Sequence, residues 1–279
     1  MVGISVIMPV GNSEKYMSEA IESVLKQSFD NFEFVIVDDG STNSAYSINQ
    51  LFTDERIRVI KNEQNFIESL NIGMNNANGK YIAIACADDI MHIDKLKIQY
   101  AIMQEYPNVD VCGTWVNIFG TGSKTDNLSC SVNGLVKKPI LKLIQGNFLF
   151  HSTVMLRVDF LRKKSLGYEN YPHAEDYKLW SEIAKSGGQF YVENRSLLYS
   201  RISDSQVSKK YKDEQKKTTE LITKEIVEYL IEQNVQEYAE LSALYKNLCK
   251  LQKKQLLTNY EISAFFRDLF SQNEKMLNL

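Results

Sequence analysis

The sequence predicts an α/β protein, with a doubly wound, mostly parallel sheet followed by a C-terminal helical appendage. Over the first 90 residues, apolar runs of strand length alternate with segments of helical periodicity. This alternation is typical of parallel sheets with helices on both faces. Two of the expected strands end in adjacent carboxylates. From Lys209 onward the sequence contains neither glycine nor proline, and its apolar residues recur at helical spacing.

The first half of the chain follows a βαβαβαβ order. Residues 4–8 predict the first strand, which we expect to stop at Pro9 because proline cannot donate to a sheet. Ser13 is a suitable cap for a helix that reaches Ser28. Further strands are expected at residues 34–37 and 57–60 and from Tyr81, and further helices at residues 46–52, 66–76 and 93–105.

The second half is less regular. Residues 109–119 predict one or two strands broken by Gly113, and residues 120–138, rich in Gly, Ser, Thr and Asn, predict a surface loop or lid. A short helix at 139–145, a strand at 152–156, an amphipathic helix at 176–186 and two short strands near Phe190 and Leu198 are expected next. We therefore expect one domain at 1–208, with halves 1–110 and 111–208, and a helical appendage at 209–279.

The composition argues against several classes of protein. A net charge of −3 provides no basic footprint for nucleic acid, so no nucleic-acid partner is expected. The four cysteines show no CxxC spacing and there are only three histidines, which argues against a zinc site or a disulfide framework and favours a cytoplasmic compartment. No basic segment precedes the first strand and no apolar run approaches about 18 residues, so neither a cleaved signal nor a membrane span is expected.

Paired carboxylates end two of the expected strands. The run from Tyr81 ends at Asp88 and Asp89, and the strand at 34–37 ends at Asp38 and Asp39. Ligands of open α/β sheets bind beyond the carboxyl ends of the strands, and adjacent carboxylates need a cation or hydrogen-bond donors to offset their repulsion. Mg²⁺ and Mn²⁺ prefer such oxygen ligands, whereas the glycine-rich motifs GxGxxG and GxxxxGK[ST] are absent. The pattern favours a nucleotide with a divalent cation, although a solvated turn before a helix cap would use the same residues.

In this order, the motifs resemble the family 2 glycosyltransferases, inverting nucleotide-sugar enzymes with the GT-A fold. The resemblance spans residues 4 to about 208. It rests on the opening strand motif at 7–12, a nucleotide-binding turn at 37–42, a metal-binding strand end at 79–89, an acceptor-side strand at 151–155 and a Glu-Asp motif at 174–180. The resemblance implies that residues 1–110 form the nucleotide-binding half and residues 111–208 the acceptor half.

The resemblance also implies roles for individual residues. Asp39 would recognise the uracil of a UDP-sugar, Asp88 would contact ribose or metal, and Asp89 would share or supply the coordination of Mn²⁺ or Mg²⁺. Asp176 would be the general base that deprotonates the acceptor hydroxyl. Further candidates are Pro9, Val10 and Asn12 on the nucleotide side and His151, Glu175 and Arg201 on the acceptor or diphosphate side.

Each assignment has a structural alternative. Asp39 and Asp176 are also suitable residues for the start of a helix, and His151 is equally compatible with a structural role. Glu175 could either orient Asp176 or bind the acceptor.

Three residues depart from the family pattern. Gly11 stands where relatives carry an aromatic residue, Cys86 occupies the first acidic position of the metal motif, and Ser203 replaces a histidine in an R-x-H-x-x-Q motif. A thiol is a poor ligand for a hard cation. These changes put metal affinity in question but not the fold.

The favoured function is an inverting transfer of sugar from a UDP-sugar to a hydroxyl of a glycan or lipid-linked acceptor, in bacterial surface polysaccharide or glycoconjugate synthesis. The alternative is a non-catalytic GT-A-fold partner of an active transferase. Residues 209–279 are candidates for contact with a second copy, with another transferase or, through the lysines of 209–217, with the inner face of the membrane.

Overall fold

The computed structural model describes residues 2–11, 14–39, 52–62, 65–120, 126–128, 132–202, 210–234 and 236–273. Contacts divide the chain into two compact units. The first unit comprises Met1–Val136, Leu149–Asn170 and Gly188–Gln206, and the second comprises Lys137–Phe148, Tyr171–Gly187 and Val207–Leu279. The second unit thus combines the C-terminal helices with two earlier segments, and a domain boundary at residue 208 stays a prediction.

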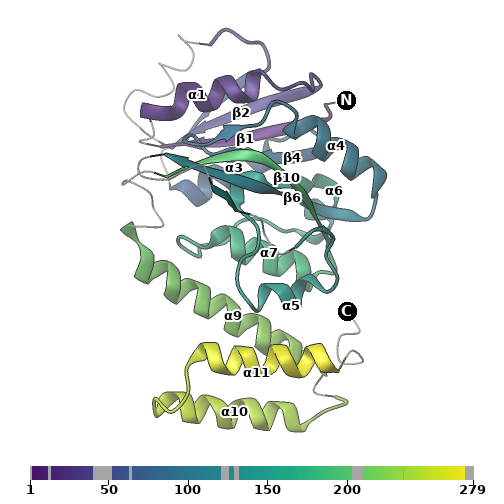
Figure 1. The fold of residues 1–279 in the computed structure, drawn as a ribbon, viewed down its shortest axis with the longest axis vertical. Coiled ribbons are helices and arrows are strands. Elements are labelled where there is room, and N and C mark those ends of the chain that lie inside the picture. The colour runs from purple at the N-terminus through teal and green to yellow at the C-terminus, as the bar shows by residue number, and fades with distance from the viewer. Residues whose placement is uncertain are drawn as a thin grey trace. The chain divides into compact units, whose positions relative to one another are not determined.

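The first unit is built on a mixed, mostly parallel ten-stranded sheet (Figure 1). Its strand order is β3-β2-β1-β4-β9-β6-β10-β5, with β7 beside β6 and β8 beside β10. The strands are β1 (Ile4–Val10), β2 (Phe32–Asp38), β3 (Ile57–Lys61), β4 (Tyr81–Ile84), β5 (Ile90–Met91), β6 (Val109–Gly120), β7 (Asp126–Leu128), β8 (Gly134–Leu135), β9 (Met155–Arg157) and β10 (Gln189–Ile202). The predicted fold class is confirmed, and β1 continues through Pro9 to Val10 in parallel register with β2.

Helices pack against both faces of this sheet. The helices of the first unit are α1 (Glu14–Leu25), α3 (Phe66–Asn75), α4 (Lys95–Glu105) and α6 (Val158–Lys164), with a short 3₁₀ turn η1 (His151–Thr153). Alternate residues of β1, such as Val6 and Met8, share one buried cluster with residues of α1 and α4. On the other face α3 packs directly on Ile7. The contact is so close that a Cβ at Gly73 would clash with an Ile7 methyl group. The alternation of side chains along a central strand therefore produces the doubly wound arrangement.

Some predictions of single elements were wrong. The strand expected at 152–156 begins as η1, because the Thr153 amide and hydroxyl both donate to the Phe150 carbonyl. The two strands expected near Phe190 and Leu198 form one strand, β10, whose register against β6 shifts between Glu193 and Leu198. Of the one or two strands expected at 109–119 the structure has one, β6, which continues through Gly113, and part of the expected loop at 120–138 forms β7 and β8. Most of the helix expected at 46–52 lies outside the described residues.

The second unit is helical. Its helices are α5 (Pro139–Leu143), α7 (Glu175–Lys185), α9 (Lys212–Asn234), α10 (Glu240–Lys253) and α11 (Asn259–Gln272). Phe266 and Phe270 of α11 are fully buried, as are Ile226 and Leu230 of α9. Among the described residues, no helix is both long enough and apolar enough to cross a membrane.

A buried salt bridge joins α7 to α9. The Lys178 ammonium lies 2.8 Å from a carboxylate oxygen of Glu225 in α9 and 2.8 Å from one of Glu182 in its own helix. Glu225 also accepts a hydrogen bond from the Tyr171 hydroxyl at 2.6 Å. These shared contacts position the start of α7 relative to α9.

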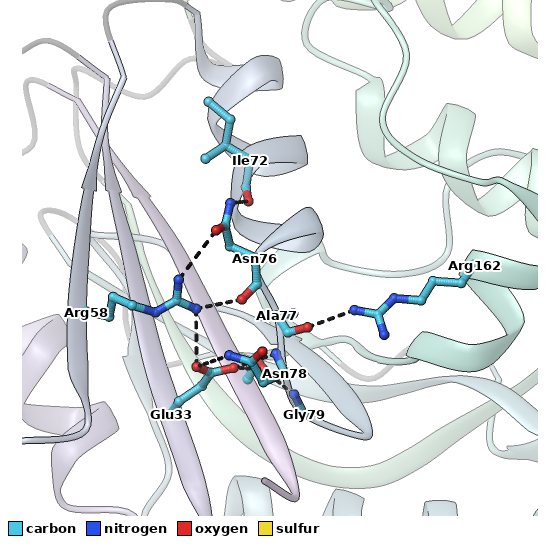
Figure 2. Close-up of polar contacts among 9 residues, drawn as sticks. Glu33, Arg58, Ile72, Asn76, Ala77, Asn78, Gly79 and Arg162 are labelled. Carbon is cyan, nitrogen blue, oxygen red and sulfur yellow. Dashed lines mark hydrogen bonds and ion pairs between the residues drawn. The ribbon is translucent and has the colours of Figure 1, made fainter. Parts of the chain in front are cut away.

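A polar network around Glu33 ties together the amino-terminal ends of the parallel strands (Figure 2). Its carboxylate accepts hydrogen bonds from the Ser5 hydroxyl at 2.5 Å, from the Asn78 backbone amide at 2.7 Å and side chain at 3.0 Å, and from Arg58 at 3.2 Å. The Ser5 hydroxyl in turn accepts from the Gly79 amide at 2.8 Å. One carboxylate thus connects β1, β2, β3 and the turn before β4.

A buried lysine lies near the opposite edge of the sheet. Lys95, the first residue of α4, is fully buried, and its ammonium group has no hydrogen-bond partner among the described residues. Burial lowers the pKa of Lys95 to about 7, with a smaller opposing effect of the Cys112 and Cys86 sulfurs. The folded chain therefore bears a buried ammonium group without a hydrogen-bond partner among the described residues, close enough to Cys86, in the segment after β4, for the two to interact electrostatically.

We expect Glu33→Gln to lower the free energy of unfolding by about 1–3 kcal/mol at neutral pH, since an amide cannot accept all four hydrogen bonds. Burial alone would raise the pKa of Glu33, but the hydrogen bonds from Ser5, Asn78 and Arg58 lower it overall. The stabilisation is therefore complete above the pKa of the unfolded chain and is lost as the pH falls through the lower folded-state pKa. Urea unfolding at several pH values tests this, and an unchanged deficit at strongly acidic pH would contradict it.

We expect Lys95→Met to raise the free energy of unfolding by about 1–4 kcal/mol at pH 7, because it removes the desolvation penalty of a buried ammonium. Since the folded-state pKa of Lys95 is near 7 and the unfolded one is ordinary, the unfolded chain binds more protons between these values. The wild type should therefore gain stability as the pH rises, and the gap to the variant should narrow. Lys97→Met, an exposed lysine on the same helix, is the control. Destabilisation by Lys95→Met at every pH would refute this account.

Candidate functional site

Asp39 lies at the carboxyl end of the central parallel strands. Its backbone amide donates to the Val10 carbonyl at 2.9 Å, and the β1–β2 register places Pro9 opposite Val37 and Val10 opposite Asp38. Burial, and then the charge of Asp38, raise the pKa of Asp39. The predicted residues Pro9, Val10 and Asp39 therefore share one edge of the sheet, whereas Asn12 lies outside the described residues.

Gly11 matters for the position of the Asp39 carboxylate. A Cβ at Gly11 would lie 2.9 Å from one carboxylate oxygen of Asp39 and 3.0 Å from the other. The carboxylate therefore occupies the space that the Cβ atom of any larger residue at position 11 would need. With an aromatic residue at position 11, as in the family pattern, the Asp39 carboxylate would have to take a different position.

Asp89 is anchored from two sides. Its carboxylate accepts a hydrogen bond from the Ser152 hydroxyl at 2.5 Å and another from the Arg201 backbone amide at 3.1 Å. The side chain is buried, with an exposed fraction of 8% for the residue. Burial, and then the charge of Asp88, raise the pKa of Asp89 to about 6, against the opposing hydrogen bonds. A bound cation would stabilise the charged form of Asp89 and so lower its pKa.

Asp88 occupies the turn after β4, and Arg201 contacts its backbone. Burial raises the pKa of Asp88, and the Arg201 guanidinium partly opposes this. The Arg201 Nε donates to the Asp88 carbonyl at 3.1 Å, and a terminal nitrogen pairs with Glu19 of α1. The guanidinium also lies over the rings of Tyr16 and Phe119. In this arrangement the Arg201 guanidinium links the turn that carries Asp88 to α1.

Three side chains in the turn after β4 could hold a metal ion. One potential ligand atom from each of Cys86, Asp88 and Asp89 lies within 4.8 Å of the others. The two carboxylates fit Mg²⁺ or Mn²⁺, which prefer oxygen, whereas the Cys86 thiol does not suit a hard cation. The donor set therefore fits a cation bound by Asp88 and Asp89.

The predicted base Asp176 belongs to the second unit. It lies in the first turn of α7, and its two carboxylate oxygens accept hydrogen bonds from the Asn147 side chain at 2.8 Å and from the Tyr177 amide at 2.7 Å. Its neighbour Glu175 is largely enclosed, and burial, followed by the charge of Asp176, raises the pKa of Glu175 to about 7. Glu175 is therefore a carboxyl group with a raised pKa next to Asp176, which accepts two hydrogen bonds. Carboxyl groups with a perturbed pKa are common in sites that catalyse proton transfer.

His151 lies in η1 rather than in a strand. Its Nε2 and the Tyr168 hydroxyl are 2.7 Å apart, and the two rings meet edge to face. The next residue, Ser152, is the one that reaches Asp89. A structural role for His151 therefore stands beside the acceptor-side role implied by the family pattern.

Sequence reasoning missed the residues whose side chains contact the predicted site residues Asp89, Arg201 and Asp176. Ser152, Glu19 and Asn147 contact Asp89, Arg201 and Asp176 respectively. Of these three residues, only Ser152 could have been singled out from the sequence, because it lies next to His151 in the predicted acceptor-side motif. The other two lie in segments where the sequence carries no chemical pattern.

Comparison with known proteins gives concordant results. A family model described as "Glycosyl transferase family 2" matches residues 5–163. A protein of Haemophilus influenzae named "Uncharacterized glycosyltransferase" is 31% identical over 82% of this chain and 74% of its own length. The crystal structure of S. aureus TarS superposes with a TM-score of 0.65 at 21% identity, covering 82% of this chain but 40% of the TarS chain. A structure of TarS residues 1–349 in complex with UDP-GlcNAc gives a TM-score of 0.67, also at 21% identity, covering 82% of this chain and 67% of that one.

We expect Ser152→Ala to weaken Mn²⁺ binding roughly ten-fold or more, because a hydrogen bond that orients a metal-binding carboxylate typically contributes this much. Paramagnetic resonance of free Mn²⁺ during a titration measures the affinity directly. Ser5→Ala is a matched control, since it removes an equally short hydroxyl–carboxylate hydrogen bond, to Glu33, at the other end of the sheet. Wild-type Mn²⁺ affinity in Ser152→Ala would show that the Ser152 hydrogen bond does not orient a metal-binding carboxylate.

Proposed function

We propose that this chain, which belongs to glycosyl transferase family 2 and is a nucleotide-sugar glycosyltransferase, transfers a sugar from a UDP-sugar to an acceptor hydroxyl with inversion. The observation that carries the proposal is the anchored Asp89, held beside Asp88 at the sheet edge that also bears Asp39. The UDP-GlcNAc complex of TarS, a protein of similar fold, supports UDP as the nucleotide.

On the donor side, each carboxylate has a distinct proposed task. Asp39 would accept a hydrogen bond from the uracil imide N–H, a role favoured by its position at the end of β2. Asp88 would contact the ribose hydroxyls or the cation, and Asp89 would bind the cation. Pro9 and Val10 would line the nucleotide site with their backbone, together with Asn12.

The cation would be Mn²⁺ or Mg²⁺, and when bound it would offset the negative charge that develops on the departing diphosphate. The chain's own contribution is to hold Asp89 in place through Ser152 and the Arg201 amide. Arg201 could add a positive charge near the diphosphate if its guanidinium exchanges Glu19 for phosphate oxygens.

On the acceptor side, Asp176 would act as the general base. Asn147 and the Tyr177 amide each occupy one of its oxygens, which fixes the orientation of the carboxylate while lone pairs remain for the acceptor proton. Glu175, whose pKa is near 7, could receive or share a proton with its neighbour. His151 and Glu175 remain candidates for binding the acceptor.

We further propose that the acceptor is a glycan or a lipid-linked glycan of bacterial surface polysaccharide or glycoconjugate synthesis, and that the enzyme works in the cytoplasm, at the inner face of the membrane. The curated bacterial relative supports a bacterial context. Residues 209–279 would then supply contacts to a membrane, a second copy or another transferase.

The decisive experiment measures UDP release from a panel of UDP-sugars in the presence of Mn²⁺. We expect turnover of one donor, its loss on addition of EDTA or in Asp89→Ala, and a decrease in kcat of about 10²–10⁴-fold in Asp176→Asn with donor binding preserved. Asp159→Asn is the matched control, because Asp159 is an exposed carboxylate in the first turn of α6.

Two results would overturn the proposal in different ways. Turnover that survives both substitutions would refute the residue assignments. Neither turnover nor metal-dependent UDP binding in the wild type would favour the alternative, a non-catalytic GT-A-fold partner of another transferase.

A further inference from the structure

A basic segment without acidic residues spans the α10–α11 corner of the second unit. Residues 241–260 contain four lysines, Lys246, Lys250, Lys253 and Lys254, and neither Asp nor Glu. This is unusual in a chain whose net charge is −3. All four lysine side chains are exposed. The corner therefore presents a local positive surface on an acidic protein.

Large apolar side chains are exposed in the same segment. Leu244 and Leu251 lie seven residues apart on α10 and are 38% and 39% exposed. At the corner itself, Leu256 is 67% exposed and Tyr260, in the first turn of α11, is 73% exposed. On a helix of 3.6 residues per turn, Lys250 and Lys254 flank Leu251, whereas Lys246 and Lys253 are each two residues from an exposed leucine and lie on the opposite side of α10. We call Leu244, Leu251, Leu256 and Tyr260 together with Lys250 and Lys254 the corner patch.

The corner patch is not the packing face of α10. Leu241 is buried, and the Tyr245 ring packs edge to face on Phe266 of α11, so the stripe through these residues faces the interior of the second unit. Leu244 and Leu251 lie on a different side of the helix and stay more than a third exposed in the described part of the chain. Figure 1 shows α10 and α11 running side by side, joined at the corner. The exposed leucines are thus a feature of the surface rather than of the core.

The composition of the corner patch indicates which kind of partner binds it. Exposed leucines and a tyrosine beside lysines are the composition of segments that lie in the interface of an anionic bilayer, with the lysine stems extended along the apolar surface and the charges at the headgroups. Pairing with a second copy through the same patch would bring four lysines together with no carboxylate from residues 241–260 between them, which is unfavourable. We propose that the corner patch docks this protein on the surface of a membrane that contains anionic lipids.

The earlier lysine run is a weaker candidate. In the described part of the chain, Lys212, Lys216 and Lys217 of α9 are interspersed with Asp213 and Glu214. These carboxylates cancel much of the positive charge, and the lysines of 209–217, a candidate membrane contact from the sequence, are therefore not part of the proposed surface.

The test is binding of the full chain to vesicles of phosphatidylcholine with and without phosphatidylglycerol, measured by co-sedimentation. No donor or acceptor is present, so the result is independent of the proposed transfer reaction. We expect binding only to the anionic vesicles and weakening with added salt. Since a lysine near such a surface contributes roughly five-fold to the partition coefficient, Lys250→Glu with Lys254→Glu should reduce binding by well over ten-fold.

Two controls separate the patch from general charge and from misfolding. Lys163→Glu with Lys164→Glu changes the net charge equally but lies on α6, where both lysines are exposed, and should leave binding nearly unchanged. Leu251→Gln with Leu256→Gln should weaken binding while retaining the wild-type helical circular dichroism. In Leu256→Trp, an emission shift to shorter wavelength on anionic vesicles reports insertion of this corner.

Several outcomes would overturn the proposal. Equal binding to both vesicle types, equal loss in the α6 control, or no binding by the wild type would each exclude an anionic membrane as the occupant. A concentration-dependent dimer that the two leucine substitutions abolish, without vesicle binding, would instead identify a second copy.

Discussion

The anchoring of the Asp89 carboxylate is the constraint on which the rest of the site depends. Two negative side chains at the end of a buried strand repel each other, and burial raises the pKa of both. Their placement requires donors from elsewhere in the fold, and these come from Ser152 in η1 and from the backbone of β10 at Arg201. The sheet order supplies this convergence, because β9 follows β4 directly and β6 and β10 come next.

The two edges of the parallel sheet serve different purposes. At the amino-terminal edge the Glu33 carboxylate accepts hydrogen bonds from Ser5, Asn78 and Arg58, which lower its pKa. At the carboxyl edge the acidic groups have raised pKa values, and the Lys95 ammonium nearby is buried without a hydrogen-bond partner among the described residues. The hydrogen bonds at the amino-terminal edge thus favour the charged form of their carboxylate, whereas burial at the carboxyl edge disfavours the charged forms of Asp88 and Asp89.

The helical unit combines a catalytic candidate with a surface candidate. Asp176 starts α7, and α7 is joined to α9 through Lys178 and Glu225. The same group of helices ends in the lysine-rich corner of α10 and α11. A lipid-linked acceptor would give both features one purpose, since its reactive sugar stays within reach of a membrane surface.

Much of the fold could be predicted from the sequence because its signals are local. Apolar runs, helical periodicity and turn chemistry placed most strands and helices, and Asp39, Asp88, Asp89 and Asp176 stood out because each follows or begins such an element. The wrong predictions occur where local patterns are ambiguous. Ser152 and Thr153 suit a strand but form η1 through backbone contacts, and Glu193 to Arg195 resemble a break but form an irregularity within β10.

The sequence by itself determined the α/β class, the family resemblance and the acidic residues at the strand ends. Only the tertiary structure decided what surrounds them. Ser152 is 63 positions from Asp89, and Arg201 is 112 positions from it. The burial of Lys95, the pairing of Arg201 with Glu19 and the exposure of Leu256 likewise depend on packing between distant segments. A local pattern specifies which element a residue joins, but its partners are set by where the sheet order and the helix packing bring the rest of the chain.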